Sequence, residues 1–245
     1  MTEKLNITVF GDSIAKGVIF RDNRYQVAQD NVISLLERHY SITIDNTAQF
    51  GQTLRRLTDK KYIERYLRRI DEKKHNLAVF CIGGNDCSFD WNSVQHTPSE
   101  AHTSATSPAE FFELLKENVT RLQSRGVHVM ILNLPPIDSE EYFRKYIAEK
   151  YDGERVMSFL KEDIANIYRH QEFFSLMLTK FALTNGCSLA DIRSRFLWKN
   201  DMRELLCEDG IHLNERGQRV MAEAIVDEVS RDPYFASFER QAASC

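Results

Sequence analysis

A serine near one end of the chain and an aspartate and histidine near the other could form an acyl-transfer centre. Asp12 and Ser13 closely follow the apolar run 5–10, at a predicted strand-to-helix turn that exposes the serine hydroxyl and places its N–H at a helix N-terminus. Asp209 and His212 lie three residues apart. At this spacing the carboxylate can hold the imidazole Nδ1–H, which leaves Nε2 as a base toward a hydroxyl. Taken alone, a serine at a helix start is more often an ordinary N-cap. An Asp-x-x-His pattern alone also occurs in loop caps and metal sites.

Two further turns carry groups that could donate hydrogen bonds to a developing oxyanion. Asn85 follows a pair of glycines at the end of the apolar run 77–82, and its amide has two N–H donors. Gly51 lies five residues after Asn46, behind the second predicted strand, and could offer a backbone N–H. Turn-forming residues alone would explain either stretch. Four such patterns, each after a different strand, together favour a single site.

Short apolar runs alternate with segments of helical period along the chain. This alternation predicts an α/β fold with three layers, in which helices cover both faces of a five-stranded parallel sheet. Ligands of such sheets bind outside the carboxyl ends of the strands, which is where the four patterns fall. Ser107 and Pro108 predict the start of one helix, and 215–230 is predicted as the last. The predicted strands are 5–10, 42–46, 77–82, 127–133 and 187–191.

The composition excludes several classes of protein. Among 245 residues, 32 are basic and 36 acidic, which gives a net charge of −4 and no basic excess for a nucleic-acid partner. No apolar run approaches the ~18 residues that a membrane span needs. Apart from His212, the histidines show no spacing typical of metal ligands, so we expect no metal and no cofactor.

The cysteines and the first residues bear on the cellular compartment. Five cysteines, an odd number scattered through the chain, indicate thiols rather than a disulfide framework. Residues 1–4 lead directly into the first predicted strand without an apolar leader. We therefore expect a cytoplasmic protein, with a processed secreted chain as the alternative. Cys87 and Cys207 both lie close to predicted site residues and could meet at the rim of the site.

Two long stretches depart from the alternating pattern. Segment 89–106 is polar and unpatterned, a predicted loop whose Phe89 and Trp91 are candidates for substrate contact. A surface loop packed by its own aromatic rings is the alternative. Segment 138–161 is charged and helix-prone, with a helix breaker at 152–153.

Two helical segments each allow two interpretations. Segment 55–74 holds nine basic residues, but interleaved acids and an apolar stripe favour a solvated amphipathic helix over a nucleic-acid patch. Segment 173–182 has a wide apolar stripe. We expect a helix clamped between the sheet and segment 138–161, and a homodimer face is the alternative.

The patterns together resemble the SGNH or GDSL hydrolases, a family of serine esterases and lipases. They span residues 11–217, so the resemblance covers nearly the whole chain and implies one domain over 1–245 with the flavodoxin-like SGNH fold and insertions near 89–106 and 138–161. Leu213 stands where the family often has Pro, and Ala48 where Gly is frequent. The matching residues are Gly11, Asp12, Ser13 and Gly17, then Asn46 and Gly51, then Gly83, Gly84, Asn85 and Asp86, and finally Asp209, His212, Asn214 and Gly217.

The resemblance implies ester hydrolysis through an acyl-enzyme. It assigns Ser13 as nucleophile, His212 as base and Asp209 as its partner. It also implies an oxyanion hole made by the N–H groups of Ser13 and Gly51 and the side chain of Asn85. Further candidates for contacting the substrate are Asp12, Asp86, Phe89 and Trp91.

The expected substrate is a small-molecule acyl ester, either a small-acyl or a carbohydrate ester. One alternative is an acyltransferase that uses the same residues. The other is a flavodoxin-like module that binds a phosphate or nucleotide. Asp12 argues against that module because an acid would stand where the anion binds, and no Gly-x-x-x-x-Gly-Lys-Ser/Thr pattern follows the first strand.

Overall fold

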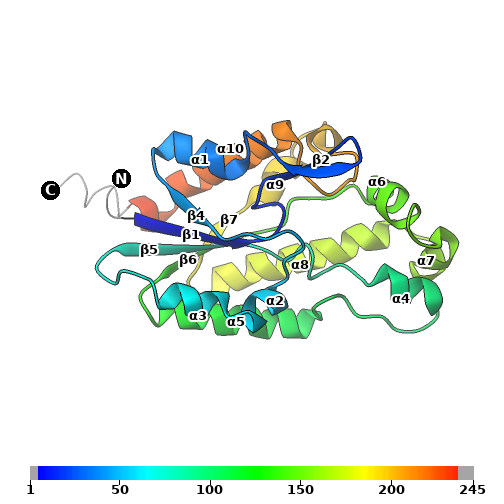
Figure 1. The fold of residues 1–245 in the computed structure, drawn as a ribbon, viewed down its shortest axis with the longest axis horizontal. Coiled ribbons are helices and arrows are strands. Elements are labelled where there is room, and N and C mark those ends of the chain that lie inside the picture. The colour runs from blue at the N-terminus through cyan, green and yellow to red at the C-terminus, as the bar shows by residue number, and fades with distance from the viewer. Residues whose placement is uncertain (1–4, 237–245) are drawn as a thin grey trace.

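Five parallel strands form one central sheet in the computed structural model, which describes residues 5–236 (Figure 1). Their order across the sheet is β4-β1-β5-β6-β7. β1 pairs with β5 along its whole length and with β4 on its other side. The predicted α/β class with a five-stranded parallel sheet is therefore confirmed. The strands are β1 (Leu5–Gly11), β4 (Ile44–Asn46), β5 (His75–Cys81), β6 (His128–Leu132) and β7 (Ser188–Ala190).

Helices cover both faces of the sheet (Figure 1). α1, α9 and α10 lie on one face, and α2, α3, α5 and α8 on the other. Successive strand residues alternate between the two cores: Val9 packs toward α1 and α10, whereas Phe10 packs toward the opposite helices. The helices are α1 (Val32–Tyr40), α2 (Leu54–Asp59), α3 (Tyr62–Leu67), α4 (Trp91–His96), α5 (Pro108–Gln123), α6 (Ser139–Tyr142), the π-helical turn η1 (Phe143–Ile147), α7 (Gly153–Phe159), α8 (Ala165–Thr184), α9 (Ile192–Leu197), the 3₁₀ turn η2 (Met202–Leu205) and α10 (Glu215–Arg231).

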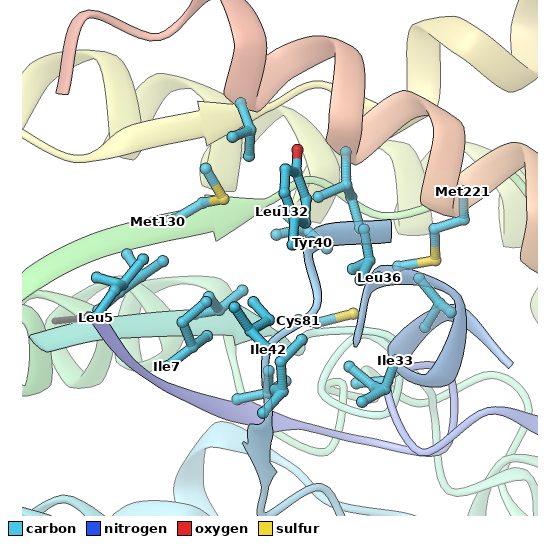
Figure 2. Close-up of a pocket in the computed structure, with 18 of the residues that line it drawn as sticks. Leu5, Ile7, Ile33, Leu36, Tyr40, Ile42, Cys81, Met130, Leu132 and Met221 are labelled. Carbon is cyan, nitrogen blue, oxygen red and sulfur yellow. The ribbon is translucent and has the colours of Figure 1, made fainter. Parts of the chain in front are cut away.

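The layer between the sheet and helices α1 and α10 contains a cavity of about 80 Å³ (Figure 2). Its lining is almost wholly apolar, with side chains such as Leu36 and Leu132 pointing into it. A cavity without polar partners for water stays dry. Of the residues discussed as site candidates, none lines it, so it belongs to the core and not to the candidate site.

The chain does not enter a helix after Ser13, so the predicted strand-to-helix turn is wrong. A tight turn leads instead into an antiparallel hairpin, β2 (Val18–Arg21) and β3 (Arg24–Val27), and the first helix begins only at Val32. Asp22 and Asn23 connect the two strands with φ angles of 52° and 57°, which is the geometry of a type I′ hairpin turn.

Three other segments differ from the sequence expectation. Segment 55–74 is not one helix, because Lys61 adopts a left-handed conformation and separates α2 from α3. Segment 89–106 is not an unpatterned loop: it contains α4, and Phe89 bridges to Ser104. Segment 138–161 is helical as expected, and its breaker is the N-cap of α7, where the Asp152 side chain accepts from the Arg155 N–H.

The predicted helix start at Ser107 and Pro108 is confirmed, and the apolar stripe of 173–182 packs on the sheet side. α5 begins at Pro108, and the Ser107 side chain caps it by accepting from the Glu110 N–H. α8 buries Phe174 against the sheet layer and leaves Phe173 about half exposed. This agrees with a helix packed on one side, and the homodimer face stays a prediction.

Gly217, in the first turn of α10, should tolerate no side chain. A Cβ there would lie 2.2 Å from the Leu205 carbonyl oxygen, a backbone atom that cannot move aside easily. We therefore expect Gly217→Ala to lower the free energy of unfolding by about 1–3 kcal/mol in urea denaturation, although alanine is the better helix former. Gly153→Ala is the control, because its Cβ would make ordinary contacts of 3.4 Å or more. The free energy of unfolding of the Gly153→Ala variant should rise by about 0.4–1 kcal/mol. Equal effects of the two substitutions would contradict the steric argument.

Candidate active site

The structure brings Ser13, His212 and Asp209 into one hydrogen-bonded chain. The Ser13 Oγ lies 2.9 Å from the His212 Nε2, and the Asp209 Oδ2 lies 2.6 Å from the His212 Nδ1. All three side chains are buried, with at most 6% of their surface exposed. With the proton on Nδ1 donated to the carboxylate, Nε2 accepts from the serine hydroxyl. This arrangement can pass the serine proton to the imidazole.

The loop before α10 fixes the orientation of the aspartate. The Asp209 Oδ1 accepts from the backbone N–H groups of Ile211 and His212, each at 3.1 Å. Gly210 has a φ of 69°, and a Cβ there would lie 2.5 Å from the Asp138 carbonyl oxygen. The Asn214 side chain then caps α10 by accepting from a backbone N–H of its first turn. The carboxylate is therefore held by backbone donors and does not depend on a mobile side chain.

Two aromatic rings that the sequence analysis did not single out flank the imidazole. The Tyr25 ring centroid lies 5.3 Å from that of His212, and the Phe50 ring stacks nearly parallel at 6.2 Å. Burial, together with the charge of Asp209, raises the pKa of Tyr25 to about 12, so its hydroxyl stays protonated. Tyr25 comes from the hairpin that the sequence analysis missed. The one signal in the sequence for Phe50 is that this aromatic residue directly precedes the predicted donor Gly51.

The predicted oxyanion donors lie on three neighbouring loops. The Asn85 side chain lines the cavity beside Ser13, and its Nδ2 donates to the Gln52 carbonyl at 3.1 Å, which leaves a second N–H. Gly51 has a φ of 65° and lies between Gln52 and the cavity residue Phe50, but does not itself line the cavity. Within residues 5–236, no hydrogen bond is found for the N–H of Ser13 or of Gly51.

Asn46 connects two of these loops without entering the cavity. Its Nδ2 donates to the Ala15 carbonyl at 2.9 Å, and its Oδ1 accepts from the Ala48 N–H at 3.1 Å. These bonds tie the loop after β4 to the turn that carries Ser13. Asn46 is therefore placed to position the site.

Asp12 lies in the wall of the cavity, next to Ser13. Its Oδ1 accepts from the Ile14 N–H at 2.9 Å, and 3% of its surface is exposed. Burial, with a smaller contribution from the nearby Asp86, raises the pKa of Asp12 to about 7, against the opposing effects of the Ile14 N–H and His212. Asp12 is a predicted substrate contact, and the structure places its weakly acidic carboxyl in the cavity wall.

Asp86 does not lie in the cavity, so the prediction that it contacts substrate is corrected. Its side chain is fully buried and accepts from the Leu54 N–H at 3.0 Å and from the Thr106 hydroxyl at 2.5 Å. Burial raises its pKa to about 6, against these hydrogen bonds. Asp86 therefore joins the start of α2 to the end of segment 89–106.

A cavity of about 300 Å³ opens beside Ser13. Phe89 and Trp91 both line it, as the sequence analysis proposed, and Trp91 is almost completely buried. Aromatic and aliphatic groups dominate the rest of the wall. Besides the residues already described, the wall is formed by Cys81, Gly84, Cys87, Ser88, Leu134, Pro135, Ile137, Tyr142, Tyr146, Lys150, Ile167, His170, Gln171 and Ile211.

The two cysteines near the site do not form a disulfide. Cys87 is a free thiol in the cavity wall, and burial raises its pKa above the usual range. Cys207 is also a free thiol, and its sulfur accepts from the Phe20 N–H of β2 at 3.3 Å, outside the cavity lining. Of the two thiols that could have met at the rim, only Cys87 lines the cavity.

Within residues 5–236, no group of three or more His, Cys, Asp or Glu side chains is arranged to hold a metal ion. In the same residues, no helix combines the length and apolar character needed to cross a membrane.

Residues 7–225 match the family model described as GDSL-like lipase/acylhydrolase. The chain belongs to this family. The resemblance to SGNH or GDSL hydrolases is confirmed, and the protein is an enzyme of the esterase and lipase class. No curated protein matches the chain significantly.

Several solved structures share the fold. A lipase/acylhydrolase from Enterococcus faecalis is 19% identical and aligns with a TM-score of 0.57 over 91% of this chain and 94% of its own. A member of the lipolytic G-D-S-L family from Veillonella parvula is 14% identical, with a TM-score of 0.60 over 93% and 100%. A catalytic mutant of an acetylxylan esterase from Geobacillus stearothermophilus is 15% identical, with a TM-score of 0.62 over 93% and 94%. These likenesses concern the fold.

The buried Asp12 should make stability depend on pH. The folded protein keeps this carboxyl protonated up to about pH 7, whereas the unfolded chain ionises it near pH 4. Raising the pH from 4 to 7 therefore favours the unfolded state, by on the order of 4 kcal/mol in total. We expect Asp12→Asn, measured by urea denaturation at pH 4, 6 and 8, to lose this part of the pH dependence. The exposed Asp59→Asn is the control. Parallel pH curves for wild type and Asp12→Asn would contradict the assignment.

Proposed function

We propose that the protein is a serine-dependent carboxylic ester hydrolase with Ser13 as nucleophile, His212 as general base and Asp209 as the group that orients the imidazole. The observation that carries the proposal is the continuous path of 2.9 Å and 2.6 Å from the serine oxygen through the imidazole to the carboxylate. Membership of a lipase and acylhydrolase family and the fold shared with an acetylxylan esterase both support an ester as substrate.

The first half of the reaction forms an acyl-enzyme. The Ser13 Oγ attacks the ester carbonyl carbon while its proton moves to the His212 Nε2. The carbonyl oxygen becomes an oxyanion, which meets the N–H groups of Ser13 and Gly51 and the Asn85 amide. When the tetrahedral intermediate collapses, the imidazolium returns the proton to the departing alcohol oxygen.

The second half releases the acid. His212 removes a proton from a water molecule, whose oxygen attacks the acyl carbon, and the Ser13 oxygen leaves and takes the proton back. The buried carboxylate of Asp209 stabilises the imidazolium in both halves because its two oxygens already accept three hydrogen bonds in a fixed geometry. His212 must be neutral to act as a base, so turnover should fall on acidification.

Removing the nucleophile tests the proposal directly. We expect Ser13→Ala to lower kcat for p-nitrophenyl esters by roughly 10⁶-fold, to the level left by binding and oxyanion stabilisation alone. Ser124→Ala is the matched control, because this exposed serine lies at the end of α5, and it should keep full turnover. Turnover by a folded Ser13→Ala variant at the wild-type rate would contradict the assignment of the nucleophile.

Removing the side-chain donor tests the oxyanion assignment. We expect Asn85→Ala to reduce kcat by roughly 10²–10³-fold, because one preorganised donor to the developing charge is lost. Circular dichroism and thermal unfolding would show that the fold is kept. Asn92→Ala, an exposed asparagine on α4, should retain wild-type kcat. An unchanged kcat in Asn85→Ala would remove this residue from the oxyanion hole.

A further inference from the structure

The cavity beside Ser13 contains two polar groups that the described part of the chain does not pair. The buried Nε2 of His170 has no hydrogen-bond partner, and burial lowers the pKa of this ring, so the imidazole is neutral near pH 7. Lys150 also lines the cavity, and within residues 5–236 its ammonium forms no ion pair. Unpaired polar groups in a cavity wall favour a ligand with complementary polar atoms. The ligand of this cavity is therefore expected to be polar in part.

Other polar side chains of the wall are bonded to the protein itself. The Trp91 Nε1 donates to the Tyr142 hydroxyl at 2.9 Å. The Gln171 Nε2 donates to the Pro135 carbonyl at 2.7 Å, and the Oε1 of the same side chain accepts from Arg193 at 2.9 Å. These groups need no ligand, so the neutral imidazole and the ammonium determine which polar atoms a ligand must offer.

A row of two aromatic rings leads from the inside of the cavity to the ammonium. The Tyr142 ring is buried, and the half-buried Tyr146 ring stacks on it with a centroid distance of 5.3 Å. The Lys150 ammonium lies 3.8 Å from the centre of the Tyr146 ring, and Lys150 itself is exposed. A contact of this kind attracts a cation to the face of the ring. The ammonium therefore lies at the solvent side of the cavity, against its wall.

The row of rings begins next to the loop that carries the general base. The N–H of Asp138, the N-cap of α6, donates to the Gly210 carbonyl at 2.8 Å. A Cβ on Gly210 would lie 2.7 Å from the backbone nitrogen of Tyr142. Ile211, between Gly210 and His212, lines the same cavity. A substrate that reaches the base therefore shares one cavity with the ammonium.

The acids near Lys150 in the sequence have other partners. Glu149 pairs with Lys145 at 3.8 Å, and the Asp152 side chain caps α7. The Asp12 carboxyl in the cavity wall has a pKa of about 7, because burial raises it, and so carries only part of a negative charge at neutral pH. The positive charge at the solvent side of the cavity is thus available to an anion from outside the protein.

We propose that the cavity binds an ester that carries an anionic group and that Lys150 recognises this group. The anion is a carboxylate or a phosphate, attached to the acyl or to the alcohol part of the substrate. The inference rests on the proposed serine hydrolase function and deepens it by naming the substrate class. The decisive observation is a cation without an ion pair, held by an aromatic ring against the wall of the cavity that contains the nucleophile.

Pairs of esters that differ only in charge test the proposal. Monomethyl esters of dicarboxylic acids from succinate to suberate carry the anion on the acyl part. Acetates of hydroxy acids from glycolate to hydroxyhexanoate, and the acetate of glycerol phosphate, carry it on the alcohol part. The terminal amides of the acids and the acetate of glycerol are the neutral matches.

Initial rates at neutral pH give kcat/KM for each pair. We expect the anionic member to react roughly 3- to 10-fold better in at least one series, and the difference to shrink at high salt. The series that shows the preference identifies the part of the substrate that carries the anion. Equal kcat/KM values within every pair, or a preference for the neutral members, would overturn the proposal.

Variants of Lys150 test which side chain reads the charge. Lys150→Met removes the charge and should reduce the ratio of anionic to neutral kcat/KM to about one, through a higher KM for the anionic ester. Lys150→Arg should keep the preference, and Lys150→Glu should reverse it. Lys180→Met, an exposed lysine on α8 outside the cavity lining, is the matched control and should keep the wild-type ratio. A wild-type ratio in folded Lys150→Met and Lys150→Glu would overturn the assignment.

The two proposals fail in distinguishable ways. Ser13-dependent hydrolysis without any preference for anionic esters would overturn the inference about the substrate and leave the ester hydrolase intact. Hydrolysis of no ester in the panel, or hydrolysis that persists at the wild-type rate in Ser13→Ala, would overturn both.

Discussion

The hydrogen bond between the Ser13 hydroxyl and the His212 ring joins groups 199 residues apart in the chain, and the rest of the structure serves to keep it in place. On one side, β1 is held in the middle of the sheet by β4 and β5, so the turn that carries Ser13 starts from a rigid strand. On the other side, α10 docks on α1, where the Gln218 side chain accepts from the Val32 N–H at 3.0 Å. A sheet and a helix pair thus fix the two ends of one 2.9 Å contact.

Three buried carboxyl groups gather around this contact, and each has a different environment. Asp209 faces an imidazole and two backbone N–H groups, which suit a negative charge. Asp12 accepts from a single backbone N–H and lies near a second acid. Burial and that acid raise its pKa. Asp86 receives hydrogen bonds from Leu54 and Thr106 and holds two loops together. The same side-chain type thereby holds the His212 ring, forms part of the cavity wall and connects loops.

The sequence was sufficient to predict the sheet and most of the candidate site, because both depend on strong local signals. Buried parallel strands are continuous apolar runs, and residues that follow such strands must meet at one edge of the sheet. The hairpin that carries Tyr25 escaped prediction because its strands have four residues each and its turn, Asp22-Asn23, lacks the glycine typical of such turns. The small hydrophobic core that joins Trp91 to Tyr142 and Val156 escaped prediction because it forms only when segments 89–106 and 138–161 pack together.

Covalent trapping of the nucleophile tests the central claim most directly. A fluorophosphonate reacts with a serine hydroxyl that an adjacent base activates, and peptide mass spectrometry then locates the adduct. The account predicts a single adduct on Ser13 in the wild-type enzyme and none in a folded His212→Ala variant. Labelling of a different side chain, or a folded wild-type enzyme that stays unlabelled, would contradict it.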